Sequence, residues 1–401
     1  MAEKKIKILT IFGTRKEFIR LYPILDKLKA DDDFESIVVT TSQYQEEIQD
    51  LYDLFDIRPD QDLNLRRSRQ SLSDITILAL SGLEPLLKSH QPDLVLVQGE
   101  STSAFVGALA AFYNKIPVAH NGAGIRTFKK MEPYPEEVNR RMVSTLSDLH
   151  FVFVAQNTEY LIHQGAIPRD IFVTGNTIID SILSVARKKR NTLCKHIPPD
   201  DLNTYKMILV TSHKKEHWGR ALKSLCFALI DLTQAYPDIQ FGFPLQFNPK
   251  LRETVSKILK NQERIHLLDQ LPYEAFVEAM SKSHLIITDS DCIREEGLGL
   301  KKPVLLVGDK DTLPDVGNWI PMDRVKVVVE TSMLLEDPKA YQSMIADSNP
   351  YGDGHAAERI VQAIRHHSGM AERPKDYKPK AEVQTTVINS ANVAVNANAM
   401  Q

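Results

Sequence analysis

Residues 6–17, IKILTIFGTRKE, contain the pattern that decides the fold of this chain. The apolar run Ile6–Phe12 predicts a buried strand, and the GTRKE turn at 13–17 leads into an amphipathic stretch that predicts a helix over 17–30. A strand, a tight turn and a helix are the first half of a βαβ unit. We therefore expect a parallel sheet that begins with residues 6–12.

The same alternation continues along the chain, which is typical of α/β proteins with parallel sheets. Further helices are predicted over 71–90 and 101–113. The continuous apolar run LVLV at 94–97 is typical of a strand covered on both faces. Strands are predicted in the first half at 36–41, 93–97, 117–120, 150–154 and 171–174, and in the second half at 207–213, 241–245, 265–268, 284–290 and 303–309.

At 401 residues, the chain is long enough for two domains. We expect an N-terminal Rossmann-like domain over 1–187 and a C-terminal one over 201–355. The basic and then proline-rich segment 188–200 is the expected linker; a surface loop within one large domain is the alternative. A helix over 356–369 is expected to cross back onto the first domain, and residues 370–401 are predicted to form a disordered tail.

The bulk composition excludes several classes of protein. The net charge of −3 gives no general attraction to nucleic acid or to an anionic membrane. The three cysteines have neither disulfide-framework nor zinc-site spacing, and a GxGxxG motif is absent. No metal or nicotinamide cofactor is therefore expected. The N-terminus has no signal-peptide pattern and the chain has no long apolar span, so a cytoplasmic location is expected.

Chemically useful side chains follow several predicted strands, where ligands of parallel sheets bind. Arg15 follows the first strand, and its guanidinium suits a phosphate. Glu100 follows the strand at 93–97, and His213 and Ser290 end two strands of the second half. Glu136 opens a helix, where acidic residues are common for dipole reasons alone. A surface arginine and a structural histidine are the alternatives for the others. Together these residues predict a cleft for an anionic ligand.

These segments taken together resemble the non-hydrolysing UDP-N-acetylglucosamine 2-epimerases, from Lys7 to about His367. The motifs that carry the resemblance occur in family order at similar spacing. They are GTRKE, RQSLSDIT at 69–76, ALAAFYNKIPVAH at 108–120, AGIRT at 123–127, PYPEEVNR at 133–140, VTGNTIID at 173–180, TDS at 288–290 with Glu295 and Glu296 following, and NPYGDG at 349–354.

The resemblance implies a GT-B-like architecture, in which two Rossmann-like domains face a central cleft, and a homodimer. It also implies interconversion of UDP-GlcNAc and UDP-ManNAc by elimination and re-addition of UDP, for cell-surface polysaccharide synthesis. The family's matching residues are catalytic at Glu100, Glu136 and His213. They bind the nucleotide sugar at Arg15, Phe276, Ser290 and Glu296, and an activating UDP-GlcNAc at Gln43, Arg69 and Gln70.

The sequence also departs from the family pattern. Glu100 replaces an aspartate and Gly122 a glutamate, so one carboxylate is missing. Asp291 and Cys292 replace two glycines of the diphosphate site, and Gly308 replaces an arginine. Glu132 is a candidate to replace the lost carboxylate. These changes leave two alternatives open, which are a catalytically lapsed paralogue with a binding or regulatory role and a glycosyltransferase of similar fold.

Overall fold

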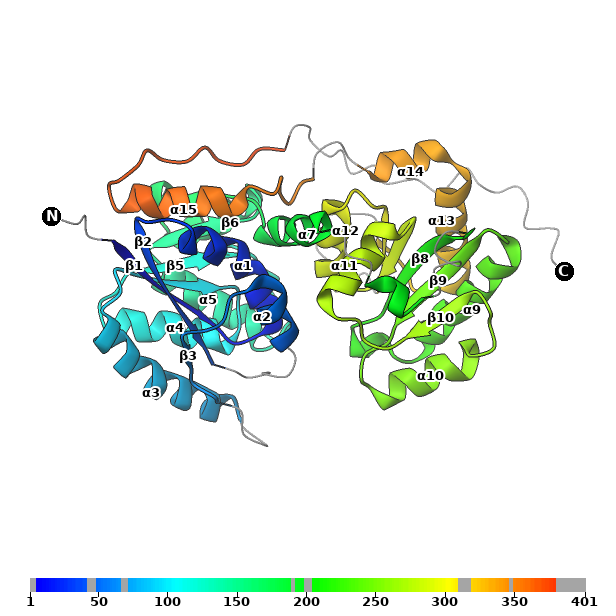
Figure 1. The fold of residues 1–401 in the computed structure, drawn as a ribbon, viewed down its shortest axis with the longest axis horizontal. Helices are drawn as coiled ribbons and strands as arrows, with labels where there is room; N and C mark the ends of the chain where they lie inside the picture. Colours follow the sequence, from blue (N-terminus) through cyan, green and yellow to red (C-terminus); the bar gives the residue numbers. More distant parts are fainter. Residues whose placement is uncertain are drawn as a thin grey trace.

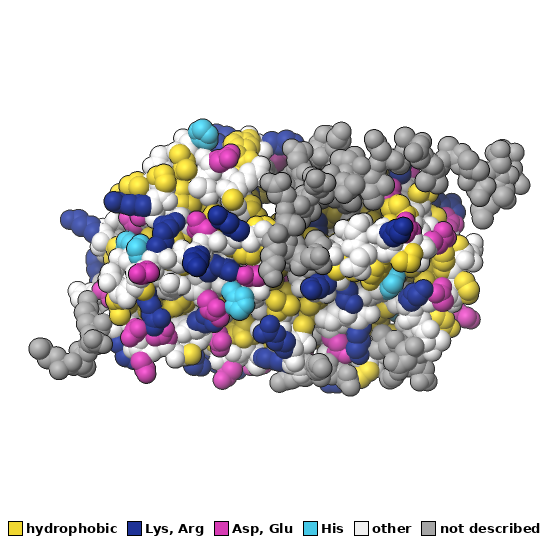
Figure 2. Space-filling model, turned by 90° about the horizontal axis from the view of Figure 1, so that it is seen from above, with side chains coloured by type: hydrophobic (Ala, Val, Ile, Leu, Met, Phe, Trp, Pro, Cys, Tyr) yellow, Lys and Arg dark blue, Asp and Glu magenta, His cyan; other side chains and the backbone are white. Residues whose placement is uncertain are grey.

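The computed structural model describes residues 5–41, 48–65, 71–188, 192–197, 204–308, 319–345 and 349–379. Figure 1 shows two lobes, each with a sheet between layers of helices, and α7 (Thr177–Arg187) between the lobes. Within the described residues, no helix is long and apolar enough to cross a membrane. On the face seen in Figure 2, acidic and basic side chains are interspersed.

The first sheet is entirely parallel, in the order β3-β2-β1-β4-β5-β6-β7. Its strands are β1 (Ile6–Phe12), β2 (Phe34–Thr40), β3 (Gln61–Asp62), β4 (Leu94–Gln98), β5 (Val118–Asn121), β6 (Leu149–Val152) and β7 (Ile171–Val173). Its helices are α1 (Arg15–Lys29), α2 (Gln49–Phe55), α3 (Leu72–His90), α4 (Thr102–Tyr113), α5 (Glu136–Leu146) and α6 (Gln156–His163).

The second sheet repeats the same strand order, β10-β9-β8-β11-β12-β13, and is also parallel. Its strands are β8 (Lys206–Thr211), β9 (Ile239–Pro244), β10 (Ile265–Leu268), β11 (Leu285–Thr288), β12 (Val304–Val307) and β13 (Trp319–Ile320). Its helices are α9 (Arg220–Ala235), α10 (Pro249–Leu259), α11 (Tyr273–Lys282), α12 (Asp291–Gly299), α13 (Arg324–Glu336) and α14 (Pro338–Met344).

This topology places a switch point between β1 and β4 in one sheet and between β8 and β11 in the other. Chain connections leave in opposite directions at a switch point, so a crevice opens at the carboxyl ends of the two strands. The predicted residues Arg15, Glu100, His213 and Ser290 follow these four strands. The strand order therefore brings together segments that the sequence had placed only at separate strand ends.

Local sequence explains why α1 begins where it does. Thr14 is the N-cap residue, and its hydroxyl accepts from the backbone N–H of Glu17 while Glu17 accepts from the backbone of Thr14. This capping box starts the helix at Arg15, two residues before the predicted start. The two-residue strands β3 and β13 were not predicted, because such short segments show no periodicity.

The two domains share an apolar core that passes through α7. The cluster of buried side chains on one face of the first sheet continues through Ile179 and Ile182 of α7 to α11 and α12 of the second domain. A Cβ atom at Gly299 would lie 3.0 Å from Ile179 Cδ1, so α12 approaches α7 closely. The predicted linker also contributes, since Leu193 and Ile197 are buried in this cluster.

Helix α15 (Ala356–His367) lies on the first domain (Figure 1). Arg365 forms ion pairs with Asp31 and Asp33 at 2.5 and 2.7 Å, and Glu358 pairs with Lys27 of α1 at 2.9 Å. The exact boundaries of the two domains and of the linker stay a prediction.

The expectation of a disordered tail over 370–401 is wrong for residues 370–379. The backbone N–H of Tyr377 donates to the carbonyl of Val173 in β7 at 2.7 Å, and Asp376 accepts from the N–H of Val173 at 3.0 Å. Arg373 donates to the carbonyl of Ile171 at 2.5 Å. The segment thus covers the edge strand β7 with one backbone and two side-chain hydrogen bonds to the backbone of that strand, which composition does not reveal. Residues 380–401 lie outside the described part of the chain.

Candidate active site

A cleft of about 2490 Å³ lies between the two domains and is lined by both. The seven predicted catalytic and nucleotide-sugar residues that the structure describes all line this cleft. They are Arg15, Glu100, Glu136, His213, Phe276, Ser290 and Glu296. The three predicted activator residues, Gln43, Arg69 and Gln70, lie outside the described residues, so the activator site stays a prediction.

Glu136 and Glu100 stand on the wall of the first domain. Glu136 is the first residue of α5, and its Oε2 atom is buried without a hydrogen-bond partner among the described residues. Glu100 follows β4 and accepts from Arg140 of α5 at 3.1 Å, while Asn139 donates to the carbonyl of Glu100 at 3.0 Å. Arg140, which the sequence reasoning missed, therefore ties the end of β4 to the helix that carries Glu136.

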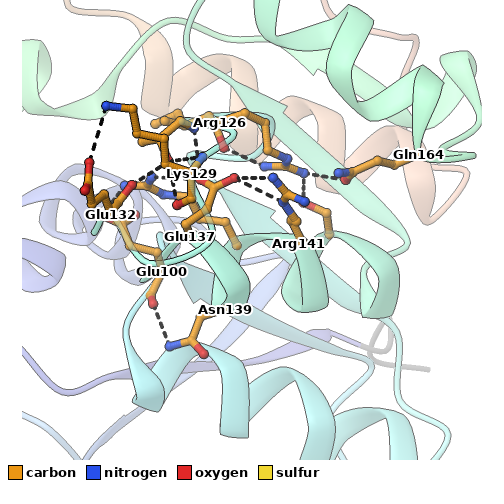
Figure 3. A network of polar contacts seen from close by, with 12 residues as sticks. Glu100, Arg126, Lys129, Glu132, Glu137, Asn139, Arg141 and Gln164 are labelled. Atoms are coloured by element: carbon orange, nitrogen blue, oxygen red, sulfur yellow. Dashed lines mark hydrogen bonds and ion pairs between the residues drawn. The ribbon is translucent and has the colours of Figure 1, made fainter. Parts of the chain in front are cut away.

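Glu137 anchors the segment that leads into α5 (Figure 3). Its fully buried carboxylate accepts from the backbone N–H of Thr127 at 2.9 Å and from Arg141 at 2.8 and 3.1 Å. Burial acts to raise the pKa of Glu137, but these hydrogen bonds outweigh it and hold the pKa below its ordinary value. A charged, well-bonded Glu137 holds the start of α5, and with it Glu136, against the loop at 125–135.

The structure does not support Glu132 as the replacement for the missing carboxylate. Its side chain is two-thirds exposed and pairs with Lys129 at 3.3 Å (Figure 3). Gly122 itself has φ +81°, and a Cβ atom there would lie 3.1 Å from both Gln98 Nε2 and Phe153 Cζ. The backbone and the neighbours of Gly122 are therefore adapted to glycine.

His213 stands on the opposite wall, directly after β8. Its backbone N–H donates to Asp289 at 2.7 Å, and its Nδ1 lies 2.6 Å from the amide nitrogen of Gln246. Burial lowers the pKa of His213 below its ordinary value; the charge of Lys16 acts in the same direction and that of Asp289 opposes it. The ring is therefore mostly neutral at pH 7 and able to accept a proton.

Asp289, at the end of β11, organises this wall. Its fully buried carboxylate accepts from the backbone N–H groups of His213 and Lys214, at 2.7 and 3.1 Å. It also lies 3.2 Å from the Ser212 hydroxyl and 3.2 Å from Nδ1 of His217. Although burial acts to raise the pKa of Asp289, these hydrogen bonds lower it. The β8 and β11 ends are thereby joined into one rigid unit.

The predicted phosphate ligand Arg15 already has a carboxylate partner. Its guanidinium forms two hydrogen bonds with Asp50 of α2, one of them at 2.9 Å. Asp50 also accepts from the backbone N–H of Tyr273 in the second domain at 3.3 Å. Sequence reasoning did not foresee this pair, because the two side chains are 35 positions apart.

The segment at the start of α12, which belongs to the predicted diphosphate site, is also paired with side chains of the protein. Ser290 is the N-cap residue but makes no side-chain capping bond. The carboxylate of Asp291 lies 3.9 Å from Lys214 and 3.6 Å from Arg294. Cys292 lies 3.6 Å from a guanidinium nitrogen of Arg20. Asp291 thus forms ion pairs with two cations that would otherwise be available to an anionic ligand.

Two glutamates of α12, the partly buried Glu295 and the buried Glu296, complete the second wall. Burial raises the pKa of Glu296 to about 7, and the carboxyl accepts from the Tyr273 hydroxyl at 3.0 Å. Glu295 pairs across the domains with Arg20 of α1 at 3.1 Å and accepts from Asn176 at 2.9 Å. Tyr273 and Arg20 are site residues that the sequence reasoning missed, since Tyr273 begins a helix five residues after β10 and Arg20 lies inside α1.

Within the described part of the chain, the His, Cys, Asp and Glu side chains form no group of three or more arranged to hold a metal ion. What the cleft does offer is a free carboxylate oxygen, a neutral imidazole and several basic side chains. This set suits proton transfer on an anionic ligand.

Comparisons with known proteins place this cleft in a family. A family model described as UDP-N-acetylglucosamine 2-epimerase matches residues 26–365. The UDP-N-acetylglucosamine 2-epimerase of Escherichia coli strain K12 is 39% identical over 373 residues, 90% of this chain and 99% of the relative. That of Bacillus subtilis strain 168 is 37% identical over 378 residues, 93% of this chain and 98% of the relative.

A solved structure agrees with these sequence matches. The crystal structure of UDP-GlcNAc 2-epimerase from Neisseria meningitidis bound to UDP-GlcNAc superposes with a TM-score of 0.81 at 35% identity, covering 90% of this chain and all of that chain. The likeness confirms the predicted α/β architecture of two Rossmann-like domains facing a cleft. The chain belongs to the UDP-N-acetylglucosamine 2-epimerase family.

Proposed function

We propose that this chain interconverts UDP-GlcNAc and UDP-ManNAc, or a closely related nucleotide sugar, by eliminating UDP and adding it back. The observation that carries the proposal is the pair of acid–base groups on facing walls. Glu136, from the first domain, has a buried oxygen without a partner among the described residues, and His213, from the second, has a lowered pKa.

Inversion at C2 requires proton transfer on both faces of the sugar, because the proton removed from one face must be replaced on the other. In the first step, a base takes the C2 proton, the C1–O bond breaks with its electron pair leaving on UDP, and a C1–C2 double bond forms. In the second step, UDP adds back to C1 while an acid protonates C2 from the opposite face. Glu136 and His213 are the proposed acid–base pair, with Glu100 assisting.

The rest of the cleft has a proposed role in holding the nucleotide. Phe276 is assigned to the uracil, Glu296 to the ribose, and Ser290 and Arg15 to the diphosphate. The Arg15–Asp50 pair requires that Arg15 either shares its guanidinium between two anions or changes partner on binding. Cytoplasmic location, a homodimer and a role in cell-surface polysaccharide synthesis complete the proposal.

The test is incubation of the pure protein with UDP-GlcNAc or UDP-ManNAc in heavy water, with the C2 position followed by NMR. Deuterium at C2 and the appearance of the other epimer are expected. A Glu136→Gln preparation from the same expression host controls for epimerase carried over from the host. Absence of both deuterium incorporation and inversion would overturn the proposal.

Two observations favour a second candidate, a lapsed paralogue that binds a partner or ligand without turnover. Asp291 pairs with two basic side chains of the proposed diphosphate site, and Gly122 has no carboxylate. This alternative predicts no C2 exchange and no heat of UDP binding in calorimetry. Measurable UDP binding together with C2 exchange rejects it.

A further inference from the structure

Most basic side chains that line the cleft already interact with a carboxylate. A cation held by a carboxylate must share or exchange that partner before it binds a phosphate. The pairs are Arg15–Asp50, Arg20–Glu295, Lys129–Glu132, Arg140–Glu100, Lys214–Asp291 and Arg294–Asp291. The cleft therefore has less accessible positive charge than its composition suggests.

Three basic side chains of the cleft form no ion pair with a carboxylate of the described residues. Arg126 donates instead to the carbonyl of Ile125 and to Ser144 and Gln164. The other two are lysines. Within the described part of the chain, neither the side chain of Lys16 nor that of Lys378 forms a hydrogen bond or ion pair, although both residues line the cleft. Lys378 belongs to the segment that follows α15. Lys16 lies in the first turn of α1, next to the carboxyl end of β1 and the switch point of the first sheet.

The position of Lys16 is unfavourable for the helix itself. The backbone N–H groups at a helix N-terminus carry partial positive charge, so a cation in the first turn is repelled. Arg15, the preceding residue, is compensated by Asp50, and the carboxylate of Glu17 accepts from the backbone N–H groups of Gly13 and Thr14. Nothing in the fold of α1 calls for an uncompensated lysine at this position.

Lys16 also faces the wall of the second domain. Burial raises the pKa of Glu296 and lowers that of His213, and in both cases the positive charge of Lys16 pushes the pKa downward. The lysine from the first domain is thus close to the groups of the second domain that are assigned to ribose and to proton transfer. A diphosphate that joins the ribose to the reacting sugar would lie between these groups.

We propose that Lys16 binds the diphosphate of the nucleotide sugar, as an accessible cation of a site in which most of the arginines are paired with carboxylates. The inference rests on the proposed function, because it takes the ligand to be a nucleoside diphosphate sugar. A lysine ammonium is a strong phosphate ligand that needs no fixed planar geometry. Lys16 is a binding residue in this assignment and has no role in proton transfer.

The test is calorimetry of UDP binding to the full chain and to three variants. Lys16→Met is expected to weaken UDP binding about tenfold or more, because a charge-assisted bond to phosphate is lost. Lys16→Arg is expected to retain most of the affinity. Lys378→Met, which removes the other unpaired lysine of the cleft, is the matched control and is expected to bind UDP as the wild type does.

Two further readouts separate binding from a structural effect. The affinity of Lys16→Met should depend less steeply on salt concentration than that of the wild type, since one phosphate contact is missing. Its thermal midpoint should equal or exceed that of the wild type, because an unfavourable charge leaves the helix N-terminus. A variant that bound UDP weakly only because it was misfolded would instead melt at a lower temperature.

Each outcome supports or overturns the inference. Equal UDP affinity of Lys16→Met and wild type overturns it and leaves the epimerase proposal standing, and so does an equal loss in Lys378→Met. If the wild type binds UDP through Lys16 but exchanges no C2 proton, the inference holds and the proposed activity fails. If the wild type does not bind UDP, both are overturned.

Discussion

The two walls of the cleft differ in how their charges are balanced. On the first-domain wall, Arg140 and Arg141 hold Glu100 and Glu137, and one oxygen of Glu136 has no partner within the part of the chain that the structure describes. On the second-domain wall, Asp289 holds the β8 end in place, but Asp291 pairs with Lys214 and Arg294. The groups proposed for proton transfer are thus held in place by neighbouring side chains, whereas the groups proposed for anion binding are partly neutralised by carboxylates of the protein itself.

The strongest test of the first-domain wall is Glu136→Gln. If this carboxylate transfers a proton at C2, its loss should lower kcat by about 10²- to 10⁴-fold, while UDP binding changes little. Turnover is measured by NMR and binding by calorimetry. Glu132→Gln is the matched control on the same loop, and its turnover should equal that of the wild type. If the two variants had equal turnover, Glu136 would lose its assigned role.

A smaller effect is expected from Glu296→Gln, and it concerns the free energy of unfolding. This variant tests whether burial keeps the Glu296 carboxyl protonated on the second-domain wall. Burial raises the pKa of Glu296 from its ordinary 4.5 to about 7. Between these two values the folded protein keeps a proton that the unfolded chain has lost. The free energy of unfolding therefore falls as pH rises from 4.5 to 7, by about 3 kcal/mol from this group.

Glutamine carries no titrating proton, so the Glu296→Gln variant should lack this part of the pH dependence. Denaturant titrations at pH 5 and pH 7.5 measure it, with wild type and variant compared at each pH. Glu17, on the first-domain wall, has a pKa raised to about 7 by the same cause, so Glu17→Gln is the matched comparison. An unchanged slope in both variants would show that neither carboxyl stays protonated in the folded state.

The smallest effect, a change in UDP affinity, is expected from Asp291→Gly. This variant tests whether the Asp291 carboxylate weakens anion binding by pairing with Lys214 and Arg294. Removing the carboxylate frees Lys214 and Arg294 and should tighten UDP binding by about three- to tenfold, or about 1 kcal/mol. Stability should fall by roughly 1 kcal/mol, because α12 loses a favourable charge in its first turn and gains a glycine.

Calorimetry and thermal unfolding measure the two effects of Asp291→Gly. Asp291→Asn serves as the control, since it removes the charge without the added backbone freedom of glycine. Should neither variant bind UDP more tightly than the wild type, Asp291 is not what limits anion binding, and the contrast between the two walls loses its main support.

Much of the fold could be predicted from the sequence. The strands at Ile6–Phe12 and Ile265–Leu268 have the predicted bounds, and the other main strands of both sheets begin and end within two residues of theirs. The prediction of strand bounds succeeds because the sequence of a buried parallel strand is a continuous apolar run. The turn that follows the strand also has a recognisable sequence pattern. Two features could not be predicted from local sequence patterns. They are the two-residue strands β3 and β13 and the docking of residues 370–379 on β7, and both depend on neighbours far away in the chain.

For the site, local sequence is enough to place side chains at strand ends and helix starts, including Arg15, Glu136 and His213. That information is local, because the spacing of apolar residues sets where each strand ends. The pairing of these side chains with one another becomes visible only in the folded chain. Arg15 meets Asp50, Arg20 meets Glu295, and Asp291 meets Lys214. Electrostatic interaction depends on distance in space, which the order of residues along the chain does not specify.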